Sequence, residues 1–224
     1  MVRKAGFAVL VLGVSLIAWV AVTIEWGDPI TSLFTRHEQH ALSRQLDTLD
    51  KRWTTAPLAR STQSNRQNVD ALLRTRADAV YRALRDGEAM GRIVIPRLHL
   101  NMVVVEGTSE GDLRRGPGHY DAASGKDTAI PGMGGVVAIA GHRTTYLHPF
   151  RHIDDLRPGD NVYLRMPYGT FRYTVFAHRV VASNDWTILR HRAFEKLVLS
   201  ACHPLYSATH RWIVFARLRG ESTA

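Results

Sequence analysis

Residues 5–24, close to the amino terminus of this 224-residue chain, form a stretch without a single charge. Twenty residues of α-helix rise about 30 Å, which matches the hydrocarbon core of a bilayer. Arg3 and Lys4 precede the stretch, and Glu25 and Asp28 follow it. Because basic flanks tend to stay in the cytoplasm, we expect a single-pass anchor with a cytoplasmic N-terminus. A cleaved signal peptide is the alternative, but its apolar region is shorter, about 7–15 residues.

Three parts follow from this anchor. Residues 1–28 are expected to form the cytoplasmic tip and the transmembrane helix. In residues 29–90, apolar positions recur at helical spacing over 42–53 and 69–84, which predicts two amphipathic helices. We interpret 29–90 as a helical stalk that holds the remaining domain off the membrane. The same segment could instead pack on that domain or pair with a second copy.

The third part, residues 91–220, changes to short β-rich runs separated by Gly, Pro, Asn and Asp. Seven or eight strands at such spacing predict a mainly β domain, either an antiparallel barrel or a sandwich. The segment 167–170, Pro-Tyr-Gly-Thr, predicts a hairpin turn between two of the runs. The runs are 92–95, 102–106, 135–140, 161–166, 171–181, 196–202 and 211–218.

The chain is basic, with 29 Lys and Arg residues against 20 Asp and Glu residues, and only two of the basic residues precede the apolar stretch. The exported part therefore carries a net positive charge. Such a charge suits anionic lipid and anionic wall polymers, so we expect a membrane surface as a partner. A general solubility charge is equally compatible. The anchor argues against nucleic acid as a partner.

Cys202 is the single cysteine, which excludes an intrachain disulfide. It ends one β-rich run, and a proline two residues later is expected to end the strand. Outside the cell an unpaired thiol oxidises unless it is buried or used. Arg211 begins the next run and would face Cys202 across a loop, while His142 follows another strand end. A cation and an imidazole would favour the thiolate, although a small buried hydrophobe remains the alternative.

The segments IAGHRTTYLHPF (139–150) and VLSACHP (198–204), with an arginine nine residues after the cysteine, resemble the sortase family. The resemblance covers about residues 90–218 and is strongest to class E sortases. The chain departs from the family in two places. It has Val-Leu-Ser-Ala-Cys where members often have Thr-Leu-x-Thr-Cys, and a Thr-His-Arg sequence at 209–211 looks like the pilus-building class C.

This resemblance implies a closed eight-stranded β-barrel and a cysteine transpeptidase without a cofactor. By position, Cys202 would be the nucleophile, His142 the general acid and base, and Arg211 the electrostatic stabiliser. The implied substrates are surface proteins with a C-terminal sorting signal, Leu-Ala-x-Thr-Gly or Leu-Pro-x-Thr-Gly, cleaved between Thr and Gly. The implied acceptor is the amine of a peptidoglycan precursor (lipid II). A class C-like enzyme that polymerises pilins is the alternative.

Four further residues are expected to bind substrate. Tyr120 resembles a specificity position of class E sortases, and its alternative is a loop tyrosine packed on the barrel. Ser200 and Ala201 flank the candidate nucleophile on its strand, and His203 follows it.

We expect no metal site. Glu106, Glu110 and Asp112 form a small acidic group, but they do not make a dedicated ligand set. A zinc hydrolase built on His148 and His152 lacks the glutamate of an HExxH motif. An L,D-transpeptidase would have an arginine two residues after the cysteine, where this chain has proline. A non-catalytic, anchored β-domain that binds the wall remains a rival, and it requires a dispensable Cys202.

Overall fold

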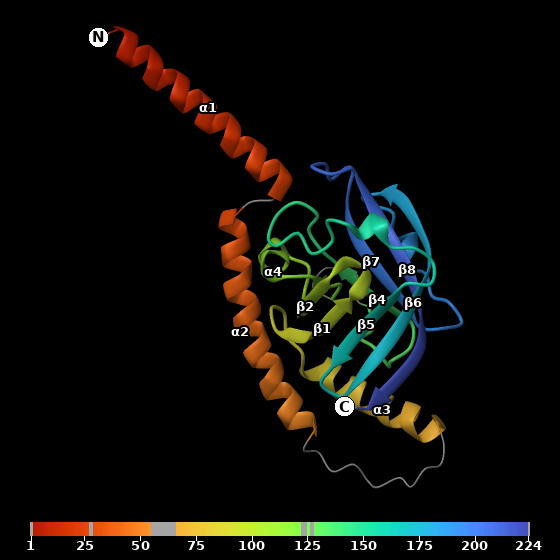
Figure 1. The fold of residues 1–224 in the computed structure, drawn as a ribbon. Helices are drawn as coiled ribbons and strands as arrows, with labels where there is room; N and C mark the ends of the chain where they lie inside the picture. The colour runs from red at the N-terminus through yellow and green to blue at the C-terminus, as the bar shows by residue number, and fades with distance from the viewer. Residues whose placement is uncertain (1, 27–28, 55–65, 122–124, 126–127, 224) are drawn as a thin grey trace.

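The computed structural model describes residues 2–26, 29–54, 66–121, 125 and 128–223 (Figure 1). Helix α1 (Val2–Trp26) projects away from the rest of the molecule and contains the uncharged stretch. Its apolar side chains face outward, and those of Phe7 and Leu12 are 70% and 73% exposed. No helix within the described part of the chain meets the length and hydropathy of a membrane span. The expected helix is therefore present, whereas its role as an anchor is not confirmed.

Eight strands close into one barrel in the order β1-β2-β3-β4-β7-β8-β6-β5. Their order and the hairpin of β5 and β6 around residues 167–168 confirm the expected mainly β, eight-stranded barrel. Short helices lie in the connections: α4 (Glu110–Arg115), η1 (Pro96–Leu98), η2 (Ile153–Asp155) and η3 (Trp186–Leu189). The strands are β1 (Ala89–Ile95), β2 (Leu100–Glu106), β3 (Gly118–His119), β4 (Val136–Ala140), β5 (Asn161–Met166), β6 (Gly169–Ala182), β7 (Lys196–His203) and β8 (His210–Thr223).

The barrel is not purely antiparallel, which corrects the expectation from strand spacing. Strands β2 and β3 pair in parallel, and so do β4 and β7. A parallel pair needs a crossover connection. Helix α4 lies in the first crossover, and the β5–β6 hairpin lies in the second. As a result β4 and β7 end at the same rim of the barrel.

Helices α2 (Pro29–Thr54) and α3 (Arg66–Ala83) pack on the barrel and do not stand free as a stalk (Figure 1). Leu42 and Leu46 of α2 are buried in a cluster with residues of β1 and β2. Leu73, Ala77 and Val80 of α3 join the main core. The predicted break between the helices falls mostly on 55–65, which lies outside the described residues. Of the arrangements left open by the sequence, the structure has the one in which the helices pack on the domain.

The N-terminal half of α2 also binds the barrel by hydrogen bonds. The Gln39 side chain accepts from the backbone N–H of Val103 at 2.7 Å and donates to its carbonyl at 3.0 Å. Strand β2 pairs with β3 only at residues 105–106, so Gln39 takes the place of a neighbouring strand at Val103. Thr35 donates to the carbonyl of Arg114 in α4 at 2.7 Å.

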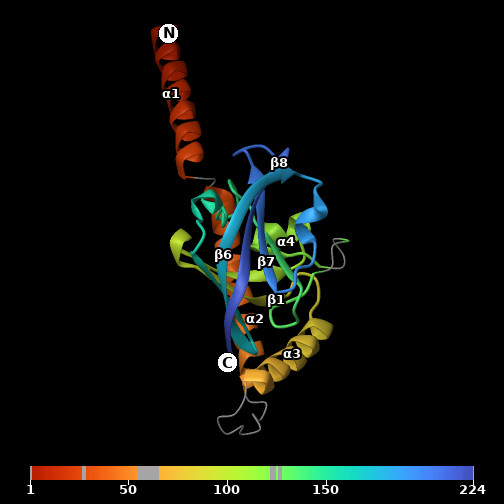
Figure 2. The same cartoon turned by 90° about the vertical axis from the view of Figure 1, so that its right-hand side faces the viewer.

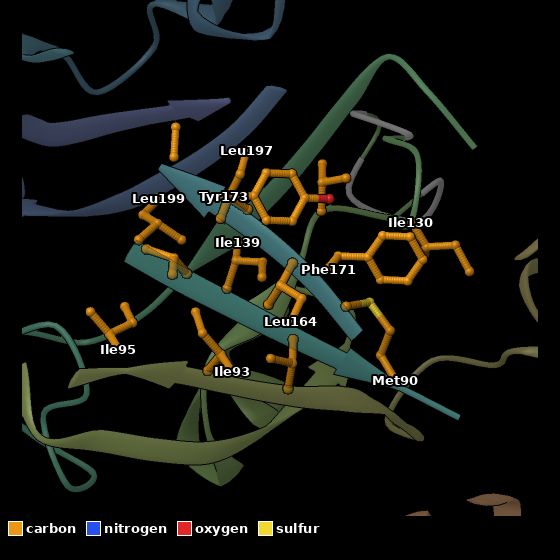
Figure 3. Close-up of a cluster of buried hydrophobic side chains, with 14 of the residues drawn as sticks. Met90, Ile93, Ile95, Ile130, Ile139, Leu164, Phe171, Tyr173, Leu197 and Leu199 are labelled. Carbon is orange, nitrogen blue, oxygen red and sulfur yellow. The ribbon is translucent and has the colours of Figure 1, made fainter. Parts of the chain in front are cut away.

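The barrel interior is filled by aliphatic and aromatic side chains from all sides of the sheet (Figure 3). Along β7, Leu197, Leu199 and Ala201 point into this core, in keeping with the alternation of a strand. Ser200 and Cys202 therefore face the outer side of the sheet. This alternation decides which residues of β7 are available to a ligand.

Candidate functional site

Cys202 is a free, half-buried thiol near the end of β7. The antiparallel register of β7 and β8 places Cys202 opposite Arg211, which confirms that these residues face each other. The Arg211 guanidinium donates to the carbonyls of Ala208 at 2.9 Å and His210 at 3.0 Å. The loop between the strands therefore holds the Arg211 cation at the same rim as the thiol.

His142 reaches this rim from β4. The last registered pair of the parallel strands β4 and β7 is Ala140 and Ser200, and His142 and Cys202 each lie two residues beyond it. The backbone N–H of Gly141 donates to the carbonyl of Ser200 at 3.0 Å, which continues the contact towards the rim. The fold thus places Cys202, His142 and Arg211 at the same rim of the barrel, each at or just beyond the end of a strand.

The His142 imidazole is half-buried, and its surroundings disfavour the protonated form. Its Nε2 is buried and, among the described residues, has no hydrogen-bond partner. Burial lowers the pKa of His142 below its ordinary value, the charge of Arg114 lowers it further, and Glu110 opposes the shift. Tyr146 packs beside the imidazole with ring centroids 5.3 Å apart. The Arg114 guanidinium lies over the Tyr146 ring, 5.8 Å from its centroid.

Arg143 links the His142 segment to the cysteine strand, a role that nothing in the sequence indicates apart from the place of Arg143 in the Gly-His-Arg motif. Its guanidinium is buried and donates to Asp154 at 2.7 Å and to the Arg151 carbonyl at 3.0 Å. Nη1 donates to the carbonyl of Cys202 at 3.4 Å. The buried Arg143 side chain therefore joins the residues after His142 to the backbone of Cys202.

The four expected substrate contacts occupy different environments. Tyr120 is half-buried, and its ring meets Trp186 edge-on with centroids 6.1 Å apart. Ser200 lies on the outer side of β7 but is only 2% exposed, and Ala201 points into the barrel core. The half-buried His203 packs against Trp212 with ring centroids 5.4 Å apart. Tyr120 and His203 are thus accessible, whereas the Ala201 side chain faces away from the thiol.

The three acidic residues that the sequence groups together, Glu106, Glu110 and Asp112, each have a different structural role. Glu106 is buried and bonds to His119 at 2.9 Å. Asp112 caps the start of α4 together with Ser109, and Glu110 pairs with Arg114. Within the described ranges, no group of three or more His, Cys, Asp and Glu side chains is placed to hold a metal ion.

A thiol, an imidazole and a guanidinium at one rim can carry out acyl transfer. The imidazole can take the thiol proton and return it to a leaving amine, while a cation can stabilise the oxyanion that forms on the attacked carbonyl. The half-buried environment strengthens these electrostatic interactions.

Comparisons with known proteins agree with this chemistry. Sortase D of Bacillus subtilis (strain 168) is 34% identical over 136 residues, which are 58% of this chain and 64% of that protein. Sortase SrtE1 of Streptomyces coelicolor (strain ATCC BAA-471 / A3(2) / M145) is 31% identical over 147 residues, which are 60% of this chain and 42% of that protein. The chain spans less than two thirds of the length of these curated relatives.

Solved structures share the fold. Sortase E1 from Streptomyces coelicolor, solved with a tripeptide in its active site, is 28% identical, has a TM-score of 0.58, and covers 62% of this chain and 93% of its own. Sortase D5 of Clostridium perfringens, a transpeptidase, is 21% identical with a TM-score of 0.60. It covers 80% of this chain and 98% of its own, and it shows the fold alone. The sequence model of the sortase domain matches residues 93–219, more than half of the chain, and we conclude that the chain belongs to the sortase family.

Proposed function

We propose that this chain is a cysteine transpeptidase that cleaves a C-terminal sorting signal and joins the released protein to an amine. The observation that carries the proposal is the convergence of the single cysteine with Arg211 and His142 at one rim. A non-catalytic wall-binding domain would have no need of a thiol that lies opposite a cation and at the same rim as an imidazole.

The reaction divides into two acyl transfers. His142 takes the proton of the Cys202 thiol, and the thiolate attacks the carbonyl of the threonine in the signal. Arg211 stabilises the oxyanion, and His142 returns the proton to the departing amine of the glycine. An incoming amine then attacks the thioester, loses a proton to His142 and releases Cys202.

The substrates proposed are surface proteins with a Leu-Ala-x-Thr-Gly or Leu-Pro-x-Thr-Gly signal, and the acceptor is the amine of a peptidoglycan precursor. Tyr120 and His203 are proposed to line the peptide site, with Ser200 beneath it. We propose that α1 anchors the enzyme in the cell membrane with its N-terminus in the cytoplasm. The uncharged stretch 5–24 and the exposed apolar side chains of α1 support this placement.

Intact-mass spectrometry of the enzyme with a sorting peptide tests the mechanism. Wild-type protein should gain the mass of the acyl fragment, and Cys202→Ala should gain none. Because Cys202 is the only cysteine, alkylation with iodoacetamide should block turnover completely. Arg211→Ala should retain the fold and lose about 100-fold in kcat. Turnover by Cys202→Ala at the wild-type rate would disprove the proposal.

The choice between the two signals is tested with peptides that differ only at the second motif position. We expect the alanine peptide to give the higher kcat/KM, because the sequence resembles class E sortases. A higher value for the proline peptide would instead assign the other signal and leave the mechanism intact.

A further inference from the structure

A basic groove of about 520 Å³ lies on the outer side of the sheet, between β6, β8 and the segment around η3. Figure 2 looks onto these strands. The floor is aromatic, with the rings of Phe176 and Phe215 stacked at a centroid distance of 6.1 Å. The groove is lined by four cationic side chains and no acidic one: Arg179, Arg190, Arg192 and Lys196. We call these four residues with the two phenylalanines the basic groove.

The four cations have no acidic partner in the described part of the chain. None of them forms an ion pair with a carboxylate within 4.0 Å. Arg179 donates to the hydroxyl of Thr187, and Lys196 donates to the carbonyls of Ile188 and Arg190, both at 2.8 Å. Burial lowers the pKa of Lys196 to about 8, and the charges of Arg192 and Arg179 contribute to the shift. The groove is therefore a concentrated positive field without a neutralising group.

The pKa of Asp185 is lowered in part by the groove arginines, but the Asp185 carboxylate is already hydrogen-bonded to Thr187. Its carboxylate accepts from the backbone N–H of Thr187 at 2.9 Å and from the hydroxyl of the same residue at 2.6 Å. These bonds are the main reason why the pKa of Asp185 lies below its usual value, and Arg179 and Arg190 make smaller contributions. A carboxylate supplied from outside would therefore find the exposed Arg179, Arg190 and Arg192 without an acidic partner in the described part of the chain, whereas Lys196 is only 4% exposed.

The basic groove lies on the same outer side of the sheet as the thiol. Arg211 is paired with Val181 of β6, and two residues further along β6 Arg179 is paired with Ile213. Phe215 is four residues from Arg211 on β8, which is about 13 Å along a strand. An extended peptide covers this distance with about four residues.

The position of the departing amine determines which end of a bound peptide would lie in the basic groove. The departing amine must lie within reach of His142, which is on the β4 side of Cys202. The acyl part of the substrate then extends the other way, towards β8 and β6. The residues that precede the sorting signal are the first ones that can reach the groove.

We propose that the basic groove binds acidic side chains of the substrate protein in the few residues immediately N-terminal to the sorting signal. This inference rests on the proposed function, since it assigns a specificity site to the same reaction. The arrangement of the cations favours several carboxylates over one phosphate group. They project from β6, from β7 and from the segment between them, and Lys196 has already used two of its three donors.

The test uses three peptides that share one sorting motif and carry three Glu, three Gln or three Lys residues directly before it. Binding is measured by fluorescence anisotropy on the full-length Cys202→Ala chain, which leaves the groove intact. The Glu peptide should bind about five-fold more tightly than the Gln peptide at low salt, and the Lys peptide should bind more weakly than both. The preference should fall towards parity in 0.5 M NaCl, because salt screens exposed charges.

Charge reversal shows whether the preference comes from this groove. Arg190 and Arg192 are exposed, and their side chains form no hydrogen bond or ion pair within the described part of the chain, so Arg190→Glu with Arg192→Glu should fold normally. This double variant should lose the preference for the Glu peptide. The matched control is Arg97→Glu with Arg165→Glu, which makes the same change in net charge at exposed positions of η1 and β5 and should keep the preference.

Turnover by the wild-type chain separates this proposal from the proposed function. A groove that binds substrate should lower KM for the Glu peptide and leave kcat unchanged. If no peptide is cleaved while the groove still selects the Glu peptide, the proposed function fails and the groove stands. Equal binding of the Glu and Gln peptides overturns the groove, and so does a preference that survives in the Arg190→Glu, Arg192→Glu chain. Competition by inorganic pyrophosphate without any Glu preference would assign a phosphate ligand and would also overturn it.

Discussion

At the scale of the residue, Arg143 is the side chain that links the two candidate catalytic segments. Its buried guanidinium bonds to Asp154, to the Arg151 carbonyl and to the carbonyl of Cys202. Arg143→Lys keeps the charge but loses the planar fork that reaches these acceptors at once. We expect kcat to fall about ten-fold with little change in KM, because His142 and Cys202 lose their mutual positioning. Steady-state kinetics on a sorting peptide measures both values.

Asp154→Asn is the matched control for Arg143. It removes the charge of one exposed partner and leaves the contact with the Cys202 carbonyl in place. Its kcat should stay within about two-fold of the wild type, because the amide oxygen that this substitution introduces can still accept a hydrogen bond from the Arg143 guanidinium. An equal loss of kcat in both variants would mean that Arg143 acts through general stability and not through the thiol.

Burial is the main cause of the lowered pKa of His142, and two charged residues of α4 shift this pKa in opposite directions, so their substitutions should do so too. Arg114 lowers the pKa of His142 and Glu110 raises it. Arg114→Gln should therefore raise the pH at which His142 takes up its proton, and Glu110→Gln should lower it. The NMR signal of His142, assigned by its absence in His142→Gln, gives both midpoints. Shifts in the same direction would contradict this account of the site.

The lowered pKa of His142 also predicts how stability changes with pH. The folded chain protonates His142 at a lower pH than the unfolded chain, whose histidines titrate near 6.5. Protonation therefore favours the unfolded state, and this contribution to stability is lost as the pH falls below about 6.5. Urea unfolding from pH 8 to pH 5 should show a smaller acid loss for His142→Gln than for the wild type.

The sequence predicted some of these residues well and others poorly, for identifiable reasons. The spacing of Cys202 and Arg211 was informative because an antiparallel hairpin converts sequence distance into a register. The acidic residues near 106–112 could not be sorted in the same way. Glu106 is the last residue of β2, whereas Glu110 and Asp112 belong to α4, which begins at Glu110.

At the scale of the element, helix α2 satisfies backbone hydrogen bonds of β2 through the Gln39 side chain, as a neighbouring strand would do. Gln39→Leu would leave the N–H and carbonyl of Val103 unpaired on the edge of β2 opposite β1, where β3 does not extend. An unpaired buried backbone group costs about 1–3 kcal/mol, so the free energy of unfolding should fall by about 2 kcal/mol. Chemical denaturation of the full chain gives this value.

His37→Leu serves as the control on the same helix. His37 is exposed, and the substitution also replaces a polar side chain of α2 by leucine, which a helix tolerates well. Its effect should stay within about 0.5 kcal/mol. If His37→Leu costs as much as Gln39→Leu, the loss comes from the surface of α2 and not from the bonds to Val103.

Strands were predictable where polar and apolar residues alternate, or where apolar residues follow one another, over five or more positions. Strand β3 was not predictable. Its two residues, Gly118 and His119, are too few to show any periodicity. They pair with β2 on one side and β4 on the other, so they are needed to close the barrel. Tertiary pairing, and not local propensity, decides that these residues form a strand.

At the scale of the whole molecule, the sequence showed two amphipathic helices but not the surface that covers their apolar faces. Amphipathic periodicity predicts that one face of a helix is buried and does not identify its partner. In the structure, Leu42 and Leu46 of α2 find that partner in Ala89, Val103 and Val105, while α3 contributes to the barrel core. The segment expected as a stalk is thereby part of the folded barrel domain.

This arrangement predicts that two truncations behave differently. A chain of residues 29–224 lacks α1 and keeps every contact of α2, so it should fold and cleave a sorting peptide in solution at the full-length rate. A chain of residues 66–224 also loses Leu42, Leu46 and the bonds of Gln39. Each buried leucine contributes about 1.5–3 kcal/mol, so its Tm should lie about 10 °C or more below that of 29–224. Calorimetry and peptide turnover on both chains measure this difference. Equal Tm values would show that α2 is a removable spacer, and an inactive but folded 29–224 would show that α1 does more than localise the enzyme.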